Sequence, residues 1–147
     1  MKDKMDALLS RSLYGHISTL DKDGYPYTIG ANVLYSGGKF YFHCAAEGEK
    51  LDNIKKNPKV CVNIDELFEI KTTGVDEPCK VGVRYESVVA RGRAAVVADE
   101  DMRLDVLKKI AAKYAPGIAG RPMPGDALER TCVVAIEVDN MTYKERL

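Results

Sequence analysis

The sequence predicts a single α+β domain, residues 1–147, that is mainly β. About six mostly antiparallel strands would form a barrel or curled sheet with peripheral helices. Segments in which apolar and polar residues alternate follow one another with only short turns between them, which favours antiparallel pairing. The few segments with helical spacing lie beside these strands. A hydrophobic fraction of 46% is sufficient for one core.

The N-terminal part is expected to begin with a helix and to continue as strands joined by tight turns. Apolar residues at helical spacing predict the helix. The sequences DKDG at 21–24 and SGG at 36–38 contain the glycines that tight turns use. The expected elements are a helix at 3–13 and strands at 14–20, 26–35 and 39–45.

The C-terminal part is expected to hold two helices and longer strands. The helix at 47–58 ends at Asn57 and Pro58, and Asp99 caps a helix with an apolar stripe. Alternation changes phase along residues 80–97, and a one-residue bulge near Ser87 would keep a single buried face. The other expected elements are a strand at 59–65, an irregular excursion at 66–79, a loop at 116–126 and a last strand at 131–138, after which the chain trails off.

Charge and hydropathy exclude several classes of function. The chain has 22 basic and 22 acidic residues, so neither a nucleic acid nor a membrane surface is an expected partner. No apolar run reaches the roughly 18 residues of a membrane span, and the charged N-terminus does not resemble a signal peptide. We expect a cytoplasmic protein. Four cysteines without a C-x-x-C pair and only two histidines predict no metal site and no structural disulfide.

The strand at 26–35 has one face that is small and polar, with a glycine in its middle. Glycine weakens a strand unless something must approach the backbone closely, and a flat ring system could be that group. A solvent-exposed sheet face explains the same pattern. The candidate cofactor-binding residues of this strand are Thr28, Ile29, Gly30, Ala31 and Asn32.

The junction between the strand at 39–45 and the following helix is a candidate anion site. His43 lies near the end of the strand, and Gly48 and Lys50 lie at the start of the helix. A helix N-terminus exposes unpaired N–H groups that favour anions. A cation in the first turn opposes the helix dipole unless an anion lies between them. A solvated basic face formed by Lys50 and its neighbours explains the spacing equally well.

The sequence contains no arrangement that identifies a catalytic residue. No nucleophile lies in a pattern with a base, and no Walker or dinucleotide-binding fingerprint occurs. Ser87 and several arginines lie on the long strand at 80–97, where they could contact a ligand, contact a partner subunit, or only keep the strand soluble.

The segment GHISTLDKDGYPYTIGANVLYSGGKFYFHCAAEGEKLDNIKKNPKVCVNI at 15–64, with YESVVARGRA further on, resembles the pyridoxamine 5'-phosphate oxidase-like FMN-binding split barrels. The branch it resembles most is the 5-nitroimidazole-resistance-protein-like group. The resemblance implies a split β-barrel with FMN at a homodimer interface. It places residues 28–32 along the isoalloxazine ring, His43 and Lys50 at the phosphate end, and Ser87 near the flavin or the subunit contact.

The sequence differs from the pyridoxamine phosphate oxidases themselves in two places. The loop AAEGEK lacks an arginine beside the lysine, and the C-terminal substrate-binding segment is absent. Oxidation of pyridoxamine phosphate is therefore not expected. Three functions remain open: an FMN-dependent oxidoreductase acting on a small molecule such as a nitroaromatic, a flavin- or haem-sequestering protein, and a structural dimer with a vestigial pocket. FAD could replace FMN, and His43 or His16 could ligate haem.

Overall fold

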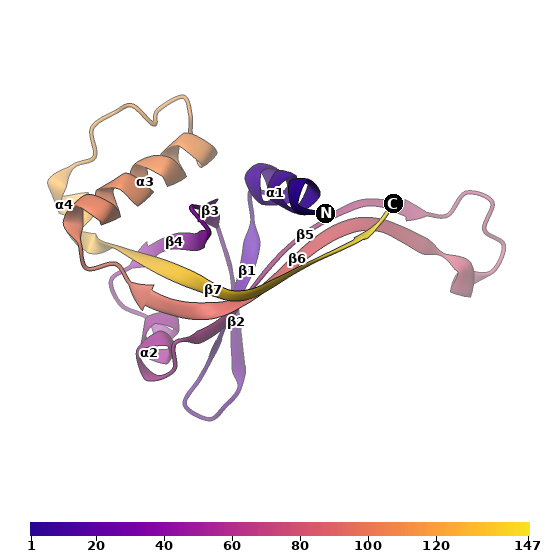
Figure 1. The fold of residues 1–147 in the computed structure, drawn as a ribbon, viewed down its shortest axis with the longest axis horizontal. Coiled ribbons are helices and arrows are strands. Elements are labelled where there is room, and N and C mark those ends of the chain that lie inside the picture. The colour runs from indigo at the N-terminus through magenta and orange to yellow at the C-terminus, as the bar shows by residue number, and fades with distance from the viewer.

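The computed structural model describes all of residues 1–147. Seven strands form one sheet, with four α-helices around it (Figure 1). The helices are α1 (Lys2–Arg11), α2 (Glu49–Lys56), α3 (Glu100–Tyr114) and α4 (Gly125–Arg130), with a short 3-10 helix at Pro78–Lys80. The strands are β1 (Gly15–Leu20), β2 (Pro26–Ala31), β3 (Leu34–Ser36), β4 (Lys39–Ala45), β5 (Lys59–Lys71), β6 (Gly82–Val96) and β7 (Thr131–Arg146).

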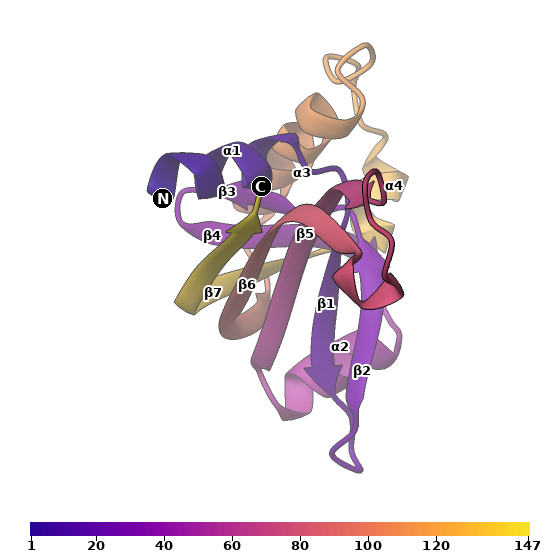
Figure 2. The ribbon, with the colours of Figure 1, turned by 90° about the vertical axis from the view of Figure 1, so that its right-hand side faces the viewer.

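The sheet is a split barrel, as the sequence predicts. Its strands pair in the order β2-β1-β5-β6-β7-β4-β3, and every pair is antiparallel. The sheet curls without closing, so β2 and β3 remain as its two edges (Figure 2). There are seven strands because the strand expected at 26–35 is interrupted at Asn32 and Val33.

Two expected boundaries are wrong because the strands extend further. β5 continues to Lys71, which pairs with Gly82, so residues 66–71 are strand and not part of an irregular excursion. β7 continues to Arg146 along β6, so the chain does not trail off after Val138. Each extension has a neighbouring strand to bond with, and that partner outweighs weak local propensity. The ends of β5 and β6 project from the barrel as an arm, residues 66–86 (Figure 1).

The bulge predicted near Ser87 is also wrong. Glu86, Val88, Ala90 and Ala94 all face the interior, so β6 keeps one phase there. The register shifts lie in its partners instead: β5 gains a residue between Leu67 and Glu69, and β7 gains one opposite the step from Arg91 to Gly92. The extra residues therefore belong to strands that are far from Ser87 in sequence.

Two apolar clusters pack the molecule. The larger one fills the barrel, and α1 and α2 each add side chains to it, with Leu8 and Leu9 from α1 and Leu51 and Ile54 from α2. The smaller one lies on the other face of β4 and β7, where α3 covers the sheet. Neither α3 nor any other helix has both the length and the apolar character needed to cross a bilayer.

Helix α1 is fixed to the sheet by charged groups. Arg11 donates to Glu66 at 2.8 Å and contacts Glu86, which is only 8% exposed. Tyr143 donates its hydroxyl to Glu86 at 2.7 Å and contacts Glu145, which also accepts from Lys4 at 2.7 Å. Each of these cations at the α1 end therefore has a carboxylate partner.

Candidate functional site

The two edges of the sheet start together and then separate, which creates the split. Leu34 pairs with Tyr41, and only Asn32 and Val33 connect that point to the end of β2. β2 itself forms no pair with β4, so the two strands separate from this point. β2 then pairs only with β1, and the last four residues of β4 pair only with β7. Both strands therefore have a free edge of backbone N–H and C=O groups beside the split.

Helix α3 fixes the point where the edges separate. The carbonyl of Val33 accepts from the Tyr114 hydroxyl at 2.8 Å and from the Lys113 ammonium at 3.1 Å. Lys113 also donates to the carbonyl of Leu9 at 3.1 Å, and burial lowers its pKa. The ammonium of Lys113 therefore joins three segments that are distant in sequence. The sequence places Tyr114 on an apolar stripe and contains no signal for this contact.

The start of α2 is an open helix N-terminus. Gly48 has φ of 139° and no atom within 4 Å of the position a Cβ would take. Its carbonyl accepts from Leu51 and Asp52, but the N–H groups of Gly48 and Lys50 have no acceptor in the chain. The Lys50 side chain is half-buried and forms no ion pair. Unpaired amides and a free ammonium at one helix end are what an anion requires.

Helix α2 is held firmly in the mouth of the barrel. Asn53 is 5% exposed and donates to the hydroxyl of Thr19 on β1 at 3.0 Å, and both groups are buried. Leu51 and Ile54 enter the barrel core on the same side of the helix. The position of Gly48 and Lys50 relative to β1 is therefore fixed by packing and by a buried hydrogen bond.

The five predicted residues of 28–32 divide between two faces of the sheet. Ile29 and Ala31 pack against the barrel core, whereas Thr28, Gly30 and Asn32 are exposed. Thr28 shares a hydrogen bond of 2.7 Å with Ser18, and Asn32 donates to the carbonyl of Leu13 at 3.0 Å. On the outer face of the sheet, only these three are available to a ligand.

A ring does lie against Gly30, and it belongs to the protein. A Cβ at Gly30 would meet the hydroxyl and ring carbons of Tyr14, so the phenol rests directly on the backbone. Tyr14 is 58% exposed and meets His16 edge-on, with ring centroids 5.8 Å apart. The missing side chain at Gly30 is therefore explained by Tyr14, and the exposed outer face of that phenol remains free for another flat group.

His43 and Lys50 lie on opposite faces of β4 and do not form one niche. His43 lines a hollow of about 300 Å³ beneath α3 and α4, with Leu107, Ile110 and Met123. Cys44 faces the other way, and Lys50 is near enough to oppose the burial that raises the pKa of its thiol. The two residues flank the free edge of β4 from its two sides.

Ser87 lies on the outer face of β6, away from the split. It accepts a hydrogen bond of 3.4 Å from Asn63 and pairs across the sheet with Asp65 and Lys144. β1 and β5 separate it from Thr28, and the residue of β6 in register with Thr28 is Arg91, four positions along the strand from Ser87. Ser87 shares a sheet face with Thr28 and Gly30 but is not their neighbour.

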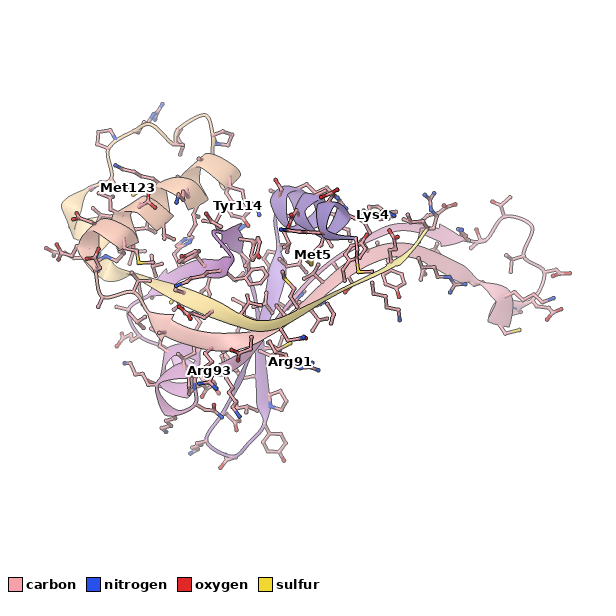
Figure 3. All side chains as sticks on the ribbon, viewed as in Figure 1. Lys4, Met5, Arg91, Arg93, Tyr114 and Met123 are labelled. Atoms are coloured by element: carbon pink, nitrogen blue, oxygen red, sulfur yellow. The ribbon has the colours of Figure 1, made fainter.

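A second hollow on this outer face was not predicted. It measures about 480 Å³ and is bordered by Ser18, Lys59, Cys61, Arg91 and Asn140, among others. Arg93 reaches Asp139 at 3.6 Å, but Arg91 has no carboxylate partner, and both arginines point away from α1 (Figure 3). The sequence shows these arginines on a long strand, but not that β1 and β5 bring Ser18 and Lys59 beside them.

The family model for pyridoxamine 5'-phosphate oxidase matches residues 1–145 of the chain. A comparison with curated proteins finds no match.

Solved structures share the fold at low sequence identity. A candidate 5-nitroimidazole antibiotic resistance protein from Bacteroides thetaiotaomicron is 22% identical with a TM-score of 0.80, covering 97% of this chain and 82% of that one. An FAD- and haem-binding protein from Mycobacterium smegmatis is 19% identical with a TM-score of 0.87, covering 99% and 71%. An FAD-binding protein from Mesorhizobium loti is 21% identical with a TM-score of 0.71, covering 100% and 96%.

Proposed function

The chain belongs to the pyridoxamine 5'-phosphate oxidase family, and we propose that it binds a flavin, FMN, in the split of its barrel. The observation that carries this proposal is the open start of α2, where Gly48, the free N–H of Lys50 and the unpaired Lys50 ammonium lie beside the free edge of β4. The flavin and haem proteins among the solved structures of this fold support the same class of ligand.

The phosphate of FMN fits the start of α2 in charge and in space. A phosphate with nearly two negative charges can accept from the free amides and from Lys50, and such charge-assisted hydrogen bonds are the stronger kind. The absent Cβ of Gly48 leaves room for it. Glu49 in the first turn acts in the opposite direction, because its carboxylate would repel the phosphate.

The free edges of β2 and β4 fit the ring of the same ligand. Their unpaired backbone groups offer donors and acceptors to the polar edge of a flat heterocycle. Tyr14, resting on Gly30, presents an aromatic surface beside one of these edges. The chain would therefore hold and orient the ring mainly through its backbone, without a dedicated charged side chain.

We further propose that the protein is an oxidoreductase for a small molecule, with a nitroaromatic as the first class to test. Bound flavin supplies hydride or single-electron transfer. The chain itself needs only to exclude water and to leave space for a substrate, so the absence of an acid–base pair is no obstacle. The name of the Bacteroides protein supports nitroaromatics as the starting class.

We also propose that the protein acts as a homodimer. The arm carries large apolar side chains that one chain leaves exposed, including Leu67 at 60%, Phe68 at 47% and Ile70 at 56%. It projects beyond the barrel, where a second copy can reach it (Figure 1). Exposed apolar residues gathered on paired strands are typical of an interface. Light scattering of the purified protein tests this, and a monomer at working concentrations would contradict it.

Absorbance spectroscopy and titration test the main proposal. We expect flavin bands in the purified or FMN-reconstituted protein, FMN rather than FAD after heat release, and oxidation of a reduced nicotinamide when a nitroaromatic is added. Flavin binding without turnover would leave sequestration as the function. A Soret band without flavin would favour haem instead, with His43 beside its apolar hollow as the ligand to test. Absence of FMN binding would contradict the proposal.

A further inference from the structure

Two of the four cysteines face each other inside the barrel. Cys44 on β4 and Cys132 on β7 are direct partners in the antiparallel ladder. Directly opposed residues project to the same face of a sheet. The Cys132 thiol is near enough to reinforce the rise in the pKa of the Cys44 thiol. Cys132 is 9% exposed and Cys44 is half-buried, so Cys44 is the more accessible residue of the pair.

The backbone geometry of such a pair is compatible with a disulfide. Opposed residues in antiparallel strands have Cα atoms about 4.5 or 5.5 Å apart, and disulfides span about 4.4 to 6.8 Å between Cα atoms. The Cβ atoms of opposed residues are somewhat further apart than a relaxed disulfide prefers. A bond here would therefore be slightly strained, and strained disulfides are reduced more easily than structural ones.

We propose that Cys44 and Cys132 form a reversible disulfide across β4 and β7 when the protein meets a hydroperoxide. The Cys44 sulfur attacks the O–O bond, which gives a sulfenic acid on Cys44 and releases the alcohol or, from hydrogen peroxide, water. The Cys132 sulfur then attacks the Cys44 sulfur, which forms the S–S bond and releases water. The two thiols lose two electrons in total, and the hydroperoxide gains them.

The surroundings of the pair make this oxidation slow. Burial, reinforced by contact with Cys132, raises the pKa of the Cys44 thiol to about 11, whereas the positive charge of Lys50 opposes this shift. Little thiolate is present at neutral pH, so the reaction needs oxidant in excess. The other two cysteines cannot compete for this bond, because Cys61 lies on the outer face of β5 and Cys79 lies on the exposed arm loop.

This inference does not rest on flavin binding, and its readout is the covalent state of four cysteines. The full chain at low concentration is treated with excess hydrogen peroxide, alkylated and digested with trypsin. Each cysteine falls in a separate tryptic peptide: residues 40–50, 60–71, 72–80 and 131–144. We expect peptide 40–50 to be joined to peptide 131–144, and any oxidation of the exposed Cys79 should appear in peptide 72–80.

Matched variants make the result decisive. The double variant Cys61→Ser and Cys79→Ser should keep the cross-link, because it changes only cysteines outside the pair. Cys44→Ser should abolish it, and dithiothreitol should restore both thiols in the wild type. Separate alkylated peptides 40–50 and 131–144 after oxidation of the double variant would overturn the proposal. Peptide 131–144 joined to any peptide other than 40–50 would overturn it too.

Discussion

Helices α1 and α2 both contribute to the barrel core, but they use their cations differently. At the α1 end, Arg11 and Lys4 each bind carboxylates, and Glu86 and Tyr143 complete a connected network. At the α2 end, Lys50 has no carboxylate partner, and the amides beside it are unsatisfied. The charged groups that hold α1 thus find their partners within one chain. The α2 end is held by Asn53 and apolar packing, and its polar groups remain free for a ligand.

The largest effect should come from breaking the network at α1. We expect Arg11→Met to lower the free energy of unfolding by about 3 kcal/mol, because Glu86 would keep its charge in a nearly buried position without its cation. This is the low end of the range for buried pairs, since Arg11 itself is partly exposed. Chemical denaturation of the flavin-free protein measures the change.

The control for Arg11 is Lys2→Met, which removes an exposed and unpaired cation from the same helix. It should change the unfolding free energy by less than about 0.5 kcal/mol. FMN affinity should stay the same in both variants. A large loss of FMN affinity in Arg11→Met while the protein remains folded would contradict the division between a structural network at α1 and a ligand site at the start of α2.

The next effect concerns the ligand end. We expect Lys50→Ala to raise the dissociation constant for FMN about 30-fold, which corresponds to roughly 2 kcal/mol for a charge-assisted contact. The stability of the flavin-free protein should hardly change, because Lys50 has no partner to lose. Lys56→Ala, at the other end of the same helix, is the matched control. Equal losses in the two variants would mean that only the overall charge of α2 matters.

A smaller effect concerns the α1 network, which should make the stability of the fold sensitive to acid. The hydrogen bond from Tyr143, and then the contact with Arg11, lower the pKa of Glu86 below its ordinary value of 4.5. A carboxylate whose pKa is lower in the folded state stabilises the fold above its unfolded pKa, and this stability is lost as the pH falls through the folded pKa. We expect stability to decline below pH 4.5.

The variant Glu86→Gln tests this origin of acid sensitivity. It should be less stable than the wild type at neutral pH and should lose less stability on acidification, because its amide does not titrate. Denaturation at a series of pH values gives both slopes. Identical slopes in variant and wild type would place the acid sensitivity in other carboxylates.

The smallest effect sharpens the description of the anion site. We expect Glu49→Gln to bind FMN about twofold to threefold more tightly, because it removes a negative charge from the first turn of α2. Glu100→Gln changes the first residue of α3 in the same way and should leave the affinity unchanged. Weaker binding in Glu49→Gln would show that the carboxylate supports the site through the helix instead of opposing the phosphate.

The sequence predicts an element well where that element depends only on neighbouring residues. The turn at 21–24, the helix that begins after Asp99 and the strand at 39–45 follow from glycine positions, a capping residue and alternation. The aspartate side chain accepts from the N–H of Met102 at 2.7 Å, as a cap should. The length of β5 and the bulges opposite β6 depend on a neighbouring strand, so no local pattern could predict them.

The candidate site was only partly predictable for the same reason. Gly48 and Lys50 are neighbours in sequence, and their shared place at the start of α2 follows from the helix itself. The ring over Gly30 is Tyr14, and the groups that fix Val33 are Lys113 and Tyr114. Those contacts join segments far apart in the chain, so the spacing of residues in the sequence does not indicate them.

By itself, the sequence determined a mainly β domain of antiparallel strands and a helix start suited to an anion, because strand alternation, turns and helix ends arise from neighbouring residues. Only the tertiary structure decided that the barrel stays split between β2 and β4 and that His43 and Lys50 lie on opposite faces. Only the tertiary structure placed Cys44 opposite Cys132 in neighbouring strands. The physical reason is that the register between strands is chosen by packing of the whole core, which a single segment does not contain.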